Sequence, residues 1–308
     1  MKSILLVLTA GLAFNVLADD PRHVIELWPG GTPESRESIG SVSVVERSDV
    51  GGIRDRITTN ISKPNLVAFP ALSKSGHALL IVPGGGYQRV VLDKEGFDIA
   101  KWYQQRGVTC FVLTYRLPGE GWSNRSYVPL QDAQRALRIV RREAETYGYD
   151  SRRIGVMGFS AGGHLAASLA TLHDLEVYAL TDETDKISAR PDFGIFIYPV
   201  ISMDPAIAHP GSREKLIGPN PEERDERLHS VELNVSADTP RVFLVHATDD
   251  SSVPVENSIR LYRALQSTDV DVDLHIFAEG GHGFGLRKAT DKPVAEWPEL
   301  AWRWIQEN

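Results

Sequence analysis

The sequence has almost none of the residues that cross-link a fold. It holds a single cysteine among 308 residues, Cys110, so no disulfide can form within the chain. No group of Cys and His residues has the spacing of a metal site, and we expect no metal ion. Stability must therefore come from a hydrophobic core, which a chain of this length can bury.

Signatures of nucleotide and nucleic-acid binding are also missing. The glycine-rich stretch Pro83–Tyr87 lacks the Lys-Ser or Lys-Thr pair of a phosphate-binding loop, and it is not G-x-G-x-x-G. There is no excess of positive charge, because 33 Lys and Arg stand against 41 Asp and Glu, a formal net charge of -8. A nucleic-acid partner would require a basic face. We therefore expect neither a cofactor nor a nucleic-acid partner.

A long apolar run occurs at the start of the chain. Lys2 precedes an apolar stretch from Ile4 to Leu17, and Val16-Leu17-Ala18 has the form of a cleavage site. The pattern predicts a secretory signal peptide over residues 1–18, because the run is short for a membrane span. We expect a secreted or periplasmic protein whose mature part, residues 19–308, has no membrane span.

Short apolar runs alternate with helical patterns through most of residues 19–308. Strands are expected at 42–46 and 66–69, as an antiparallel edge and a wrapping arm, and then at 77–82, 108–115, 153–159, 193–198, 242–246 and 270–277. Helices are expected at 96–105, 129–147, 163–172, 255–267 and 297–306. This alternation predicts one α/β domain with a mostly parallel, doubly wound sheet and helices on both faces.

The alternation is interrupted between residues 199 and 240. Prolines and charges are frequent there, with prolines at Pro205, Pro210, Pro219, Pro221 and Pro240. We expect an irregular excursion over one end of the sheet. Ligands of open α/β sheets bind at the carboxyl ends of the strands, so the excursion either lines a substrate site or is a surface loop.

A serine lies in the pattern G-x-S-x-G between the strand at 153–159 and the helix after it. In Gly158-Phe159-Ser160-Ala161-Gly162, a Cβ at either glycine would crowd the tight turn. Such a turn exposes the hydroxyl at the N-terminus of a helix. Ser160 is the predicted nucleophile. The alternative is a structural serine in a tight turn, because the pattern alone is not specific.

A nucleophilic serine needs a general base and a carboxylate that orients the base. The strand at 242–246 leads to Asp249 and Asp250, and the strand at 270–277 leads to His282, which has a glycine on each side. The spacing D-x-x-V-P favours Asp250 as the acid, with Asp249 as the alternative. His282 is the predicted base because its setting and chain order suit the role better than those of His209, His229, His246 and His275.

Donors for a developing oxyanion are expected near the serine. The residue after a nucleophilic serine supplies one backbone N–H, here that of Ala161. Further donors are expected in Gly84-Gly85-Gly86, where glycines at a strand end let N–H groups turn toward a substrate. We assign Gly85 and Gly86 together with Ala161.

Together these motifs resemble the secreted α/β-hydrolase esterases of the acetylxylan esterase type, which include bifunctional acetylxylan-feruloyl esterases. The resemblance covers roughly residues 55–305 and is carried by Pro83–Tyr87, Asp93–Gly96, Tyr115–Pro118, Gly158–Leu165, Asp250–Pro254 and Gly280–Phe284. It implies an α/β-hydrolase fold and a serine carboxylic-ester hydrolase that deacetylates a plant or algal polysaccharide or oligosaccharide through a Ser-His-Asp triad and an acyl-enzyme. Its partner would be a small ester or an acylated carbohydrate.

The resemblance has one departure and leaves two alternatives. Hormone-sensitive-lipase-like esterases have His-Gly-Gly-Gly where this chain has Pro83-Gly84-Gly85-Gly86, so lipase specificity is not implied. A prolyl-oligopeptidase-like peptidase would normally carry an N-terminal propeller, for which residues 19–76 are too short. A noncatalytic carbohydrate-binding protein on a hydrolase fold is the other alternative.

Overall fold

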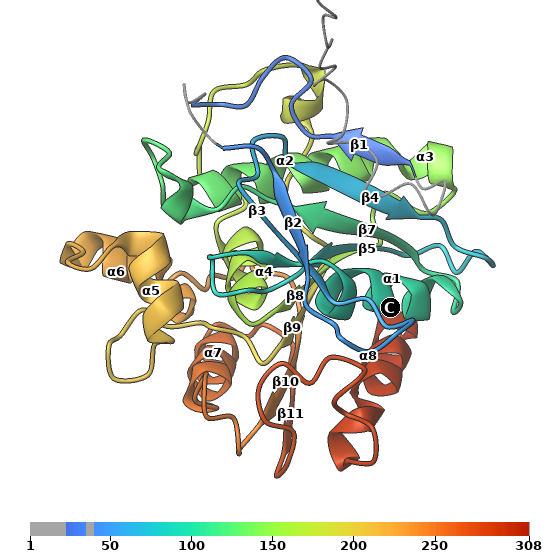
Figure 1. The fold of residues 1–308 in the computed structure, drawn as a ribbon, viewed down its shortest axis with the longest axis vertical. Coiled ribbons are helices and arrows are strands. Elements are labelled where there is room, and N and C mark those ends of the chain that lie inside the picture. Colours follow the sequence, from blue (N-terminus) through green and yellow to red (C-terminus); the bar gives the residue numbers. More distant parts are fainter. Residues whose placement is uncertain (1–22, 35–39, 308) are drawn as a thin grey trace, which may run out of the picture.

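A computed structural model describes residues 23–34 and 40–307 of the chain (Figure 1). The predicted signal peptide, residues 1–18, lies outside the described residues. The central feature is an eight-stranded sheet, ordered β1-β4-β7-β5-β8-β9-β10-β11. Its strands are β1 (Val24–Glu26), β4 (Asn65–Phe69), β5 (Ala78–Val82), β7 (Thr109–Thr114), β8 (Ile154–Phe159), β9 (Phe193–Ile197), β10 (Val242–Ala247) and β11 (Val272–Phe277).

The six strands from β7 to β11 in this order are parallel, and β4 is antiparallel to both β1 and β7. The central strands are continuous buried apolar runs, such as Ala-Leu-Leu-Ile-Val in β5. Such runs are typical of parallel strands that are covered on both faces. The predicted mostly parallel sheet is confirmed.

Helices cover both faces of the sheet. Figure 1 shows α2, α4 and α7 along one face and α1 and α8 along the other. The helices are α1 (Asp98–Gln104), α2 (Val128–Arg142), α3 (Ala144–Tyr147), α4 (Ala161–Thr171), α7 (Glu256–Ser267) and α8 (Trp297–Gln306), and short 3₁₀ turns occur at η3 (Pro118–Glu120), η4 (Glu183–Lys186) and η6 (Pro293–Glu296). Among the described residues, none of these helices combines the length and apolar character needed to cross a membrane.

Three predicted helices differ from the observed ones in their boundaries. The helix expected at 129–147 is divided at Glu143 into α2 and α3, and Gly148 ends it in a left-handed conformation. The helix expected at 96–105 is preceded by a π-helical turn, η2 (Asp93–Phe97). The helix after the serine begins at Ala161, directly after the turn, rather than at residue 163.

A second, three-stranded antiparallel sheet lies beside the glycine-rich loop. It consists of β2 (Ser43–Glu46), β3 (Arg56–Thr59) and β6 (Val90–Val91). The strand expected at 42–46 therefore pairs in this small sheet and is not part of the edge of the main sheet. Because β6 follows the glycine-rich loop directly, the small sheet places residues 47 and 89 near the end of β5.

The excursion between residues 199 and 240 is not wholly irregular. It contains α5 (Pro210–Ile217), α6 (Glu223–His229) and a 3₁₀ turn, η5 (Val231–Leu233), so the prediction of irregular structure was wrong for these segments. Pro210 is the first residue of α5, a position that tolerates proline, and the His209 side chain accepts the Ser212 N–H as a cap. The excursion leaves from the carboxyl end of β9 and carries His209 to the pocket described below.

Candidate active site

Ser160 lies in the tight turn between β8 and α4. Its backbone has φ 54° and ψ -120°, a strained conformation for a residue with a side chain. A Cβ at Gly158 would lie 2.3 Å from the Gly162 carbonyl oxygen, and one at Gly162 would lie 2.2 Å from the Val82 carbonyl oxygen. Both glycines are therefore required by the close approach of the backbone, as the sequence predicts.

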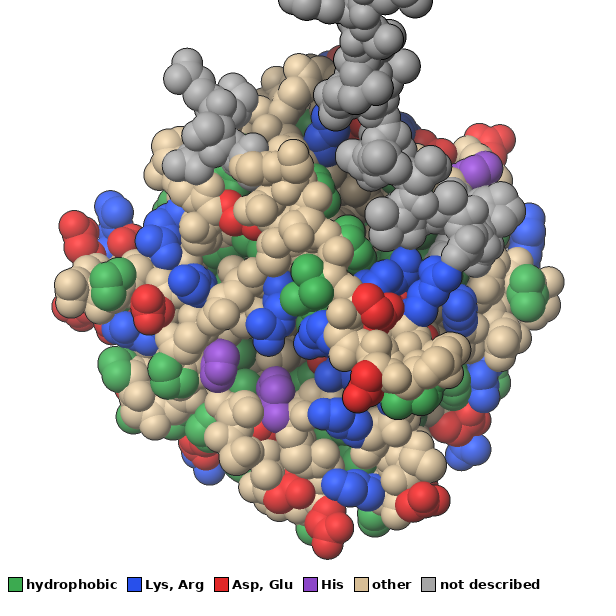
Figure 2. Space-filling model, viewed as in Figure 1, with side chains coloured by type: hydrophobic (Ala, Val, Ile, Leu, Met, Phe, Trp, Pro, Cys, Tyr) green, Lys and Arg blue, Asp and Glu red, His purple; other side chains and the backbone are tan. Residues whose placement is uncertain are grey.

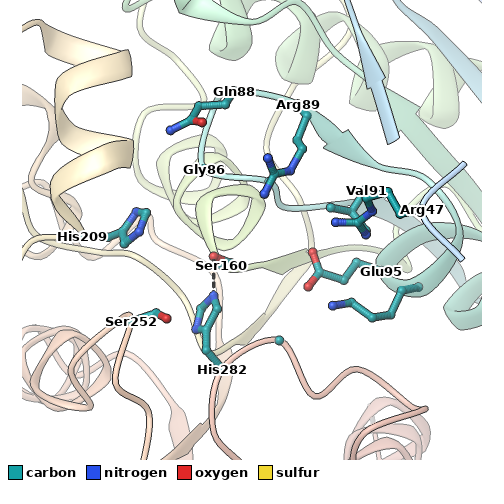
Figure 3. A pocket seen from close by; sticks show the side chains of 13 residues that line it. Arg47, Gly86, Gln88, Arg89, Val91, Glu95, Ser160, His209, Ser252 and His282 are labelled. Atoms are coloured by element: carbon teal, nitrogen blue, oxygen red, sulfur yellow. Dashed lines mark hydrogen bonds between the residues drawn. The ribbon is translucent and has the colours of Figure 1, made fainter. Parts of the chain in front are cut away.

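The three side chains predicted for catalysis form one hydrogen-bonded chain, of which Figure 3 shows the bond between Ser160 and His282. Ser160 Oγ lies 2.9 Å from His282 Nε2, and His282 Nδ1 lies 2.7 Å from Asp250 Oδ2. Asp250 follows β10 and His282 follows β11, so the parallel sheet brings both to the edge at which β8 ends. The arrangement can transfer a proton from the serine hydroxyl to an imidazole that a carboxylate orients.

Asp250 is buried and its carboxylate is held by several donors. Its Oδ1 accepts the N–H groups of Ser252 (2.8 Å) and Val253 (2.9 Å). Burial is the largest single influence on the pKa of Asp250 and raises it, but hydrogen bonds from His246 and His282 bring the pKa well below its ordinary value. Asp250 is therefore ionised beside His282 at neutral pH.

His246 lies behind Asp250, a position that the sequence analysis did not identify. Its Nε2 lies 3.3 Å from Asp250 Oδ2 and 3.0 Å from the Val253 carbonyl oxygen, while its Nδ1 lies 2.8 Å from Ser258 Oγ. Because a carbonyl only accepts, Nε2 carries the proton. His246 is thus a buried donor to the carboxylate and not a competing base. Its position four residues before Asp250 is the one sequence signal for this contact.

Asp249, the alternative acid, has a different set of partners. Its Oδ1 accepts the N–H groups of Gly280 (2.9 Å) and Gly281 (2.7 Å). These glycines directly precede His282. Asp249 therefore fixes the loop that carries the histidine, and the His282 ring itself is bonded to Asp250.

Two of the predicted oxyanion donors line the same pocket as the serine, and the third follows it directly in the chain. Gly85 and Gly86 have φ of 132° and 67°, and both line the pocket with Ser160. Ala161 is the first residue of α4, so its N–H has no partner in the helix. Within the described part of the chain, none of these three N–H groups donates a hydrogen bond to another residue. With no partner among the described residues, these N–H groups can donate to an anionic oxygen.

Glu95, which the sequence analysis did not single out, links three loops of the site. Its Oε2 accepts the Gly84 N–H (3.0 Å), and its Oε1 accepts the Tyr198 hydroxyl (3.1 Å). The Tyr198 oxygen also accepts the Gly285 N–H (3.3 Å), and the Tyr198 ring packs on His282 with centroids 5.1 Å apart. Glu95 therefore ties the glycine-rich loop to the loop that carries His282.

Ser160 and His282 line a pocket with a volume of about 320 Å³. Its wall is polar and carries three cations and one carboxylate. The lining residues are Arg47, Gly85, Gly86, Gln88, Arg89, Val91, Lys94, Glu95, Ser160, His209, Ser252, His282 and Gly283. Figure 3 shows Arg47, Arg89 and Glu95 on one side of Ser160 and His209 on the opposite side. Over the described ranges, no group of three or more His, Cys, Asp or Glu side chains is placed to hold a metal ion.

Comparison with protein families places most of the chain in one group. The BD-FAE family model matches residues 67–265, which include Ser160 and Asp250. A second model, for the dienelactone hydrolase family, matches residues 228–307, which include Asp250 and His282.

Two curated relatives resemble the chain over more than two thirds of its length. The chain is 35% identical over 239 residues to an acetylxylan esterase of Xylanibacter ruminicola, a match that covers 75% of this chain and 46% of that protein. It is 36% identical over 219 residues to endo-1,4-beta-xylanase B of Butyrivibrio fibrisolvens, covering 71% of this chain and 34% of the relative. The chain thus spans less than half the length of these two curated relatives.

A solved structure matches over nearly its whole length. The acetyl ester-xyloside bifunctional hydrolase of Caldicellulosiruptor lactoaceticus superposes with a TM-score of 0.75 at 36% sequence identity. The superposition covers 92% of this chain and 96% of that one. The fold is that of the α/β-hydrolases.

Proposed function

The chain belongs to the BD-FAE family of α/β-hydrolases, and from this premise we propose that it is a serine carboxylic-ester hydrolase. The observation that carries the proposal is the hydrogen-bonded chain of Ser160, His282 and Asp250 beside a pocket that Gly85 and Gly86 line, with backbone N–H groups that have no partner among the described residues. The relatives named as an acetylxylan esterase and an acetyl ester-xyloside hydrolase support the same reaction class. Residues 19–308 would form one catalytic domain.

In the proposed acylation, Ser160 Oγ attacks the carbonyl carbon of an ester and its proton moves to His282 Nε2. Asp250 holds the Nδ1–H of the ring, which keeps Nε2 ready to accept the proton and stabilises the imidazolium that forms. The N–H groups of Gly85, Gly86 and Ala161 bind the oxyanion of the tetrahedral intermediate. His282 then donates its proton to the leaving alcohol, and the acyl group remains on Ser160.

Deacylation repeats these steps with water in place of the serine. His282 Nε2 removes a proton from a water molecule, which attacks the acyl carbonyl. The tetrahedral intermediate collapses, His282 returns the proton to Ser160 Oγ, and the carboxylic acid leaves. The strained turn at Ser160 presents Oγ to the pocket for both half-reactions.

We further propose that the substrate is an acetylated plant or algal polysaccharide or oligosaccharide. The support is the polar lining of the pocket, which suits a sugar better than a long acyl chain, together with the names of the relatives. The signal-peptide pattern of residues 1–18 supports release to a periplasm or the medium, where such polymers are found.

The nucleophile is tested by Ser160→Ala. Turnover of 4-nitrophenyl acetate should fall by about 10⁶-fold, the scale seen when such a serine is removed. Ser252→Ala is the matched control, because Ser252 lines the same pocket but contacts Asp250 only through its backbone N–H. This variant should keep wild-type turnover. Comparable rates for Ser160→Ala and the wild type would remove Ser160 from the mechanism.

The substrate class is tested by acetate release from acetylated xylan beside hydrolysis of 4-nitrophenyl acetate and butyrate. Release from xylan is expected. Hydrolysis of the small esters alone would keep the mechanism and discard the polysaccharide. Cleavage of an aminoacyl-proline amide in place of esters would indicate a peptidase. Failure of the folded protein to react with a fluorophosphonate would indicate a noncatalytic binding protein.

A further inference from the structure

We propose that three cations of the active-site pocket, Arg47, Arg89 and Lys94, bind an anionic substituent of the substrate, a carboxylate or a sulfate on the acylated sugar or its neighbour. We call these residues the cationic wall. The inference rests on the proposed function, because it concerns the substrate of the same site.

The cationic wall is assembled from three separate segments. Arg47 follows β2, Arg89 precedes β6 and Lys94 lies in η2, and all three border the pocket that contains Ser160. The chain as a whole has a formal net charge of -8, so a cluster of three positive side chains is opposite in sign to the net charge of the protein. Figure 2, which shows the molecule from the same side as Figure 1, has several Lys and Arg side chains gathered beside two histidines near the middle of the view.

Arg89 offers a guanidinium to the pocket. Among the described residues it has no ion pair and no side-chain hydrogen bond, and its side chain is directed toward the space above Ser160 (Figure 3). Its backbone is fixed against the oxyanion loop, since a Cβ on Gly85 would lie 2.2 Å from the Arg89 carbonyl oxygen. A guanidinium held in this way can bind a carboxylate or sulfate through two N–H groups at once.

Lys94 is half-buried and likewise forms no ion pair within the described ranges. Burial lowers its pKa, while the charge of Glu95 raises it. Its Nζ would lie 3.3 Å from a Cβ on Gly283, which places the ammonium beside the loop that carries His282. A cation that is partly removed from water without a bonded anion is stabilised by a ligand of opposite charge.

The two carboxylates near the wall are already engaged. Asp55 pairs with Arg47 at 2.8 Å, so Arg47 contributes less to the wall than the other two cations. Glu95 is buried, and its oxygens accept the Gly84 N–H and the Tyr198 hydroxyl. Neither carboxylate forms an ion pair with Arg89 or Lys94 among the described residues, so these two are the cations of the wall most available to a ligand.

The test compares polymers that differ only in charge. Glucuronic-acid-bearing xylan is used intact or with its carboxyl groups reduced to alcohols, and a third sample is sulfated xylan. All are then acetylated to the same degree. We expect kcat/KM to be about tenfold higher on a charged polymer than on the reduced one, with the difference lost in about 0.5 M NaCl because salt screens partly exposed charges. The first and third polymers distinguish a carboxylate from a sulfate.

Variants assign the preference to the wall. Arg89→Gln and Lys94→Gln should each lower the ratio of kcat/KM on the charged polymer to that on the reduced polymer by about threefold, the scale of a partly exposed ion pair, so that the two contacts together account for the tenfold preference. Arg89 is exposed, so its substitution leaves the core intact. Arg153→Gln is the matched control. Arg153 precedes β8, at the end of the strand opposite Ser160, and its loss should leave the ratio unchanged.

The outcomes separate this inference from the proposed function. Equal rates on charged and reduced polymers overturn the anion site and leave the esterase intact, and so does a ratio that Arg89→Gln and Lys94→Gln do not change. If no ester is hydrolysed, the proposed function is wrong, and calorimetric binding of Ser160→Ala to the two polymers decides the anion site alone. Tighter binding to the charged polymer supports it, and equal binding overturns it.

Discussion

At the scale of single residues, two adjacent aspartates have different tasks. Asp250 binds the His282 ring, and Asp249 binds the backbone of the loop before it. Asp250→Asn should lower kcat by about 10⁴-fold. The asparagine oxygen would stay with the backbone N–H groups of the loop, so its amide N–H₂ would face His282 Nδ1 and favour the tautomer that carries its proton on Nε2, which cannot accept the proton of the serine. Asp249→Asn keeps an acceptor oxygen for the glycines and should cost less than about tenfold. Steady-state kinetics on 4-nitrophenyl acetate with both variants checks the pair, and the reverse ranking would move the acid to Asp249.

The sequence predicted the positions of those candidate residues that are tied to a local pattern. Ser160 and Asp250 follow apolar strands, His282 follows a strand in which apolar and polar residues alternate, and each has glycine, proline or a turn nearby, so a parallel sheet must place them at one edge. His246 and Glu95 have no such pattern, because their partners are defined by tertiary packing. Glu95 contacts Tyr198, which is 103 residues away, and no sequence pattern predicts that contact.

At the scale of elements, the turn between β8 and α4 is the most constrained. Gly158→Ala would place a methyl group 2.3 Å from the Gly162 carbonyl oxygen and 2.6 Å from the Ala166 Cβ. We expect destabilisation of about 3 kcal/mol or more, since backbone must move to relieve the contact. Gly30→Ala is the matched control, because nothing lies within 4 Å of the added Cβ. Urea denaturation of both variants measures the difference, and similar midpoints would show that the turn can relax.

Elements were predicted well where hydrophobic pattern decides them. The apolar runs predicted as strands correspond to β5, β7, β8, β9 and β10, with boundaries within two residues. Continuous apolar runs of this length are typical of parallel strands that are buried on both faces. Short pieces were missed. β6 has two residues, and α5 and α6 are short and polar, so their structure depends on caps and neighbours more than on periodicity.

At the scale of the whole molecule, two buried histidines limit stability in acid. His164 accepts the Tyr87 hydroxyl and donates to the His229 carbonyl oxygen. Burial, the leading cause in both cases, lowers the pKa of His164 to about 4 and that of His229 to about 3. Both rings are therefore neutral in the folded protein at pH values where the unfolded chain has protonated them.

This difference sets the direction of the pH dependence. Between pH 6.5 and pH 4 the unfolded chain binds more protons, so the free energy of unfolding falls as the pH falls. His164 alone accounts for roughly 3 kcal/mol over that range, at about 1.4 kcal/mol per pKa unit. His209 and His275, whose pKa values are also lowered by burial, act in the same direction. Urea denaturation at several pH values should show the loss, with a shallower slope for His164→Gln. An unchanged slope would contradict the assignment.

The contacts of Glu95 have a consequence for how this chain can diverge. One carboxylate holds Gly84, Tyr198 and, through that tyrosine, Gly285, so an accepted substitution at residue 95 would need simultaneous compensation in loops that lie far apart in the gene. Arg89 and Lys94 have no such bonds to described residues and can change one at a time. Single mutations can therefore change the charge of the pocket wall one residue at a time, while the contacts of Glu95 change only if several residues change together.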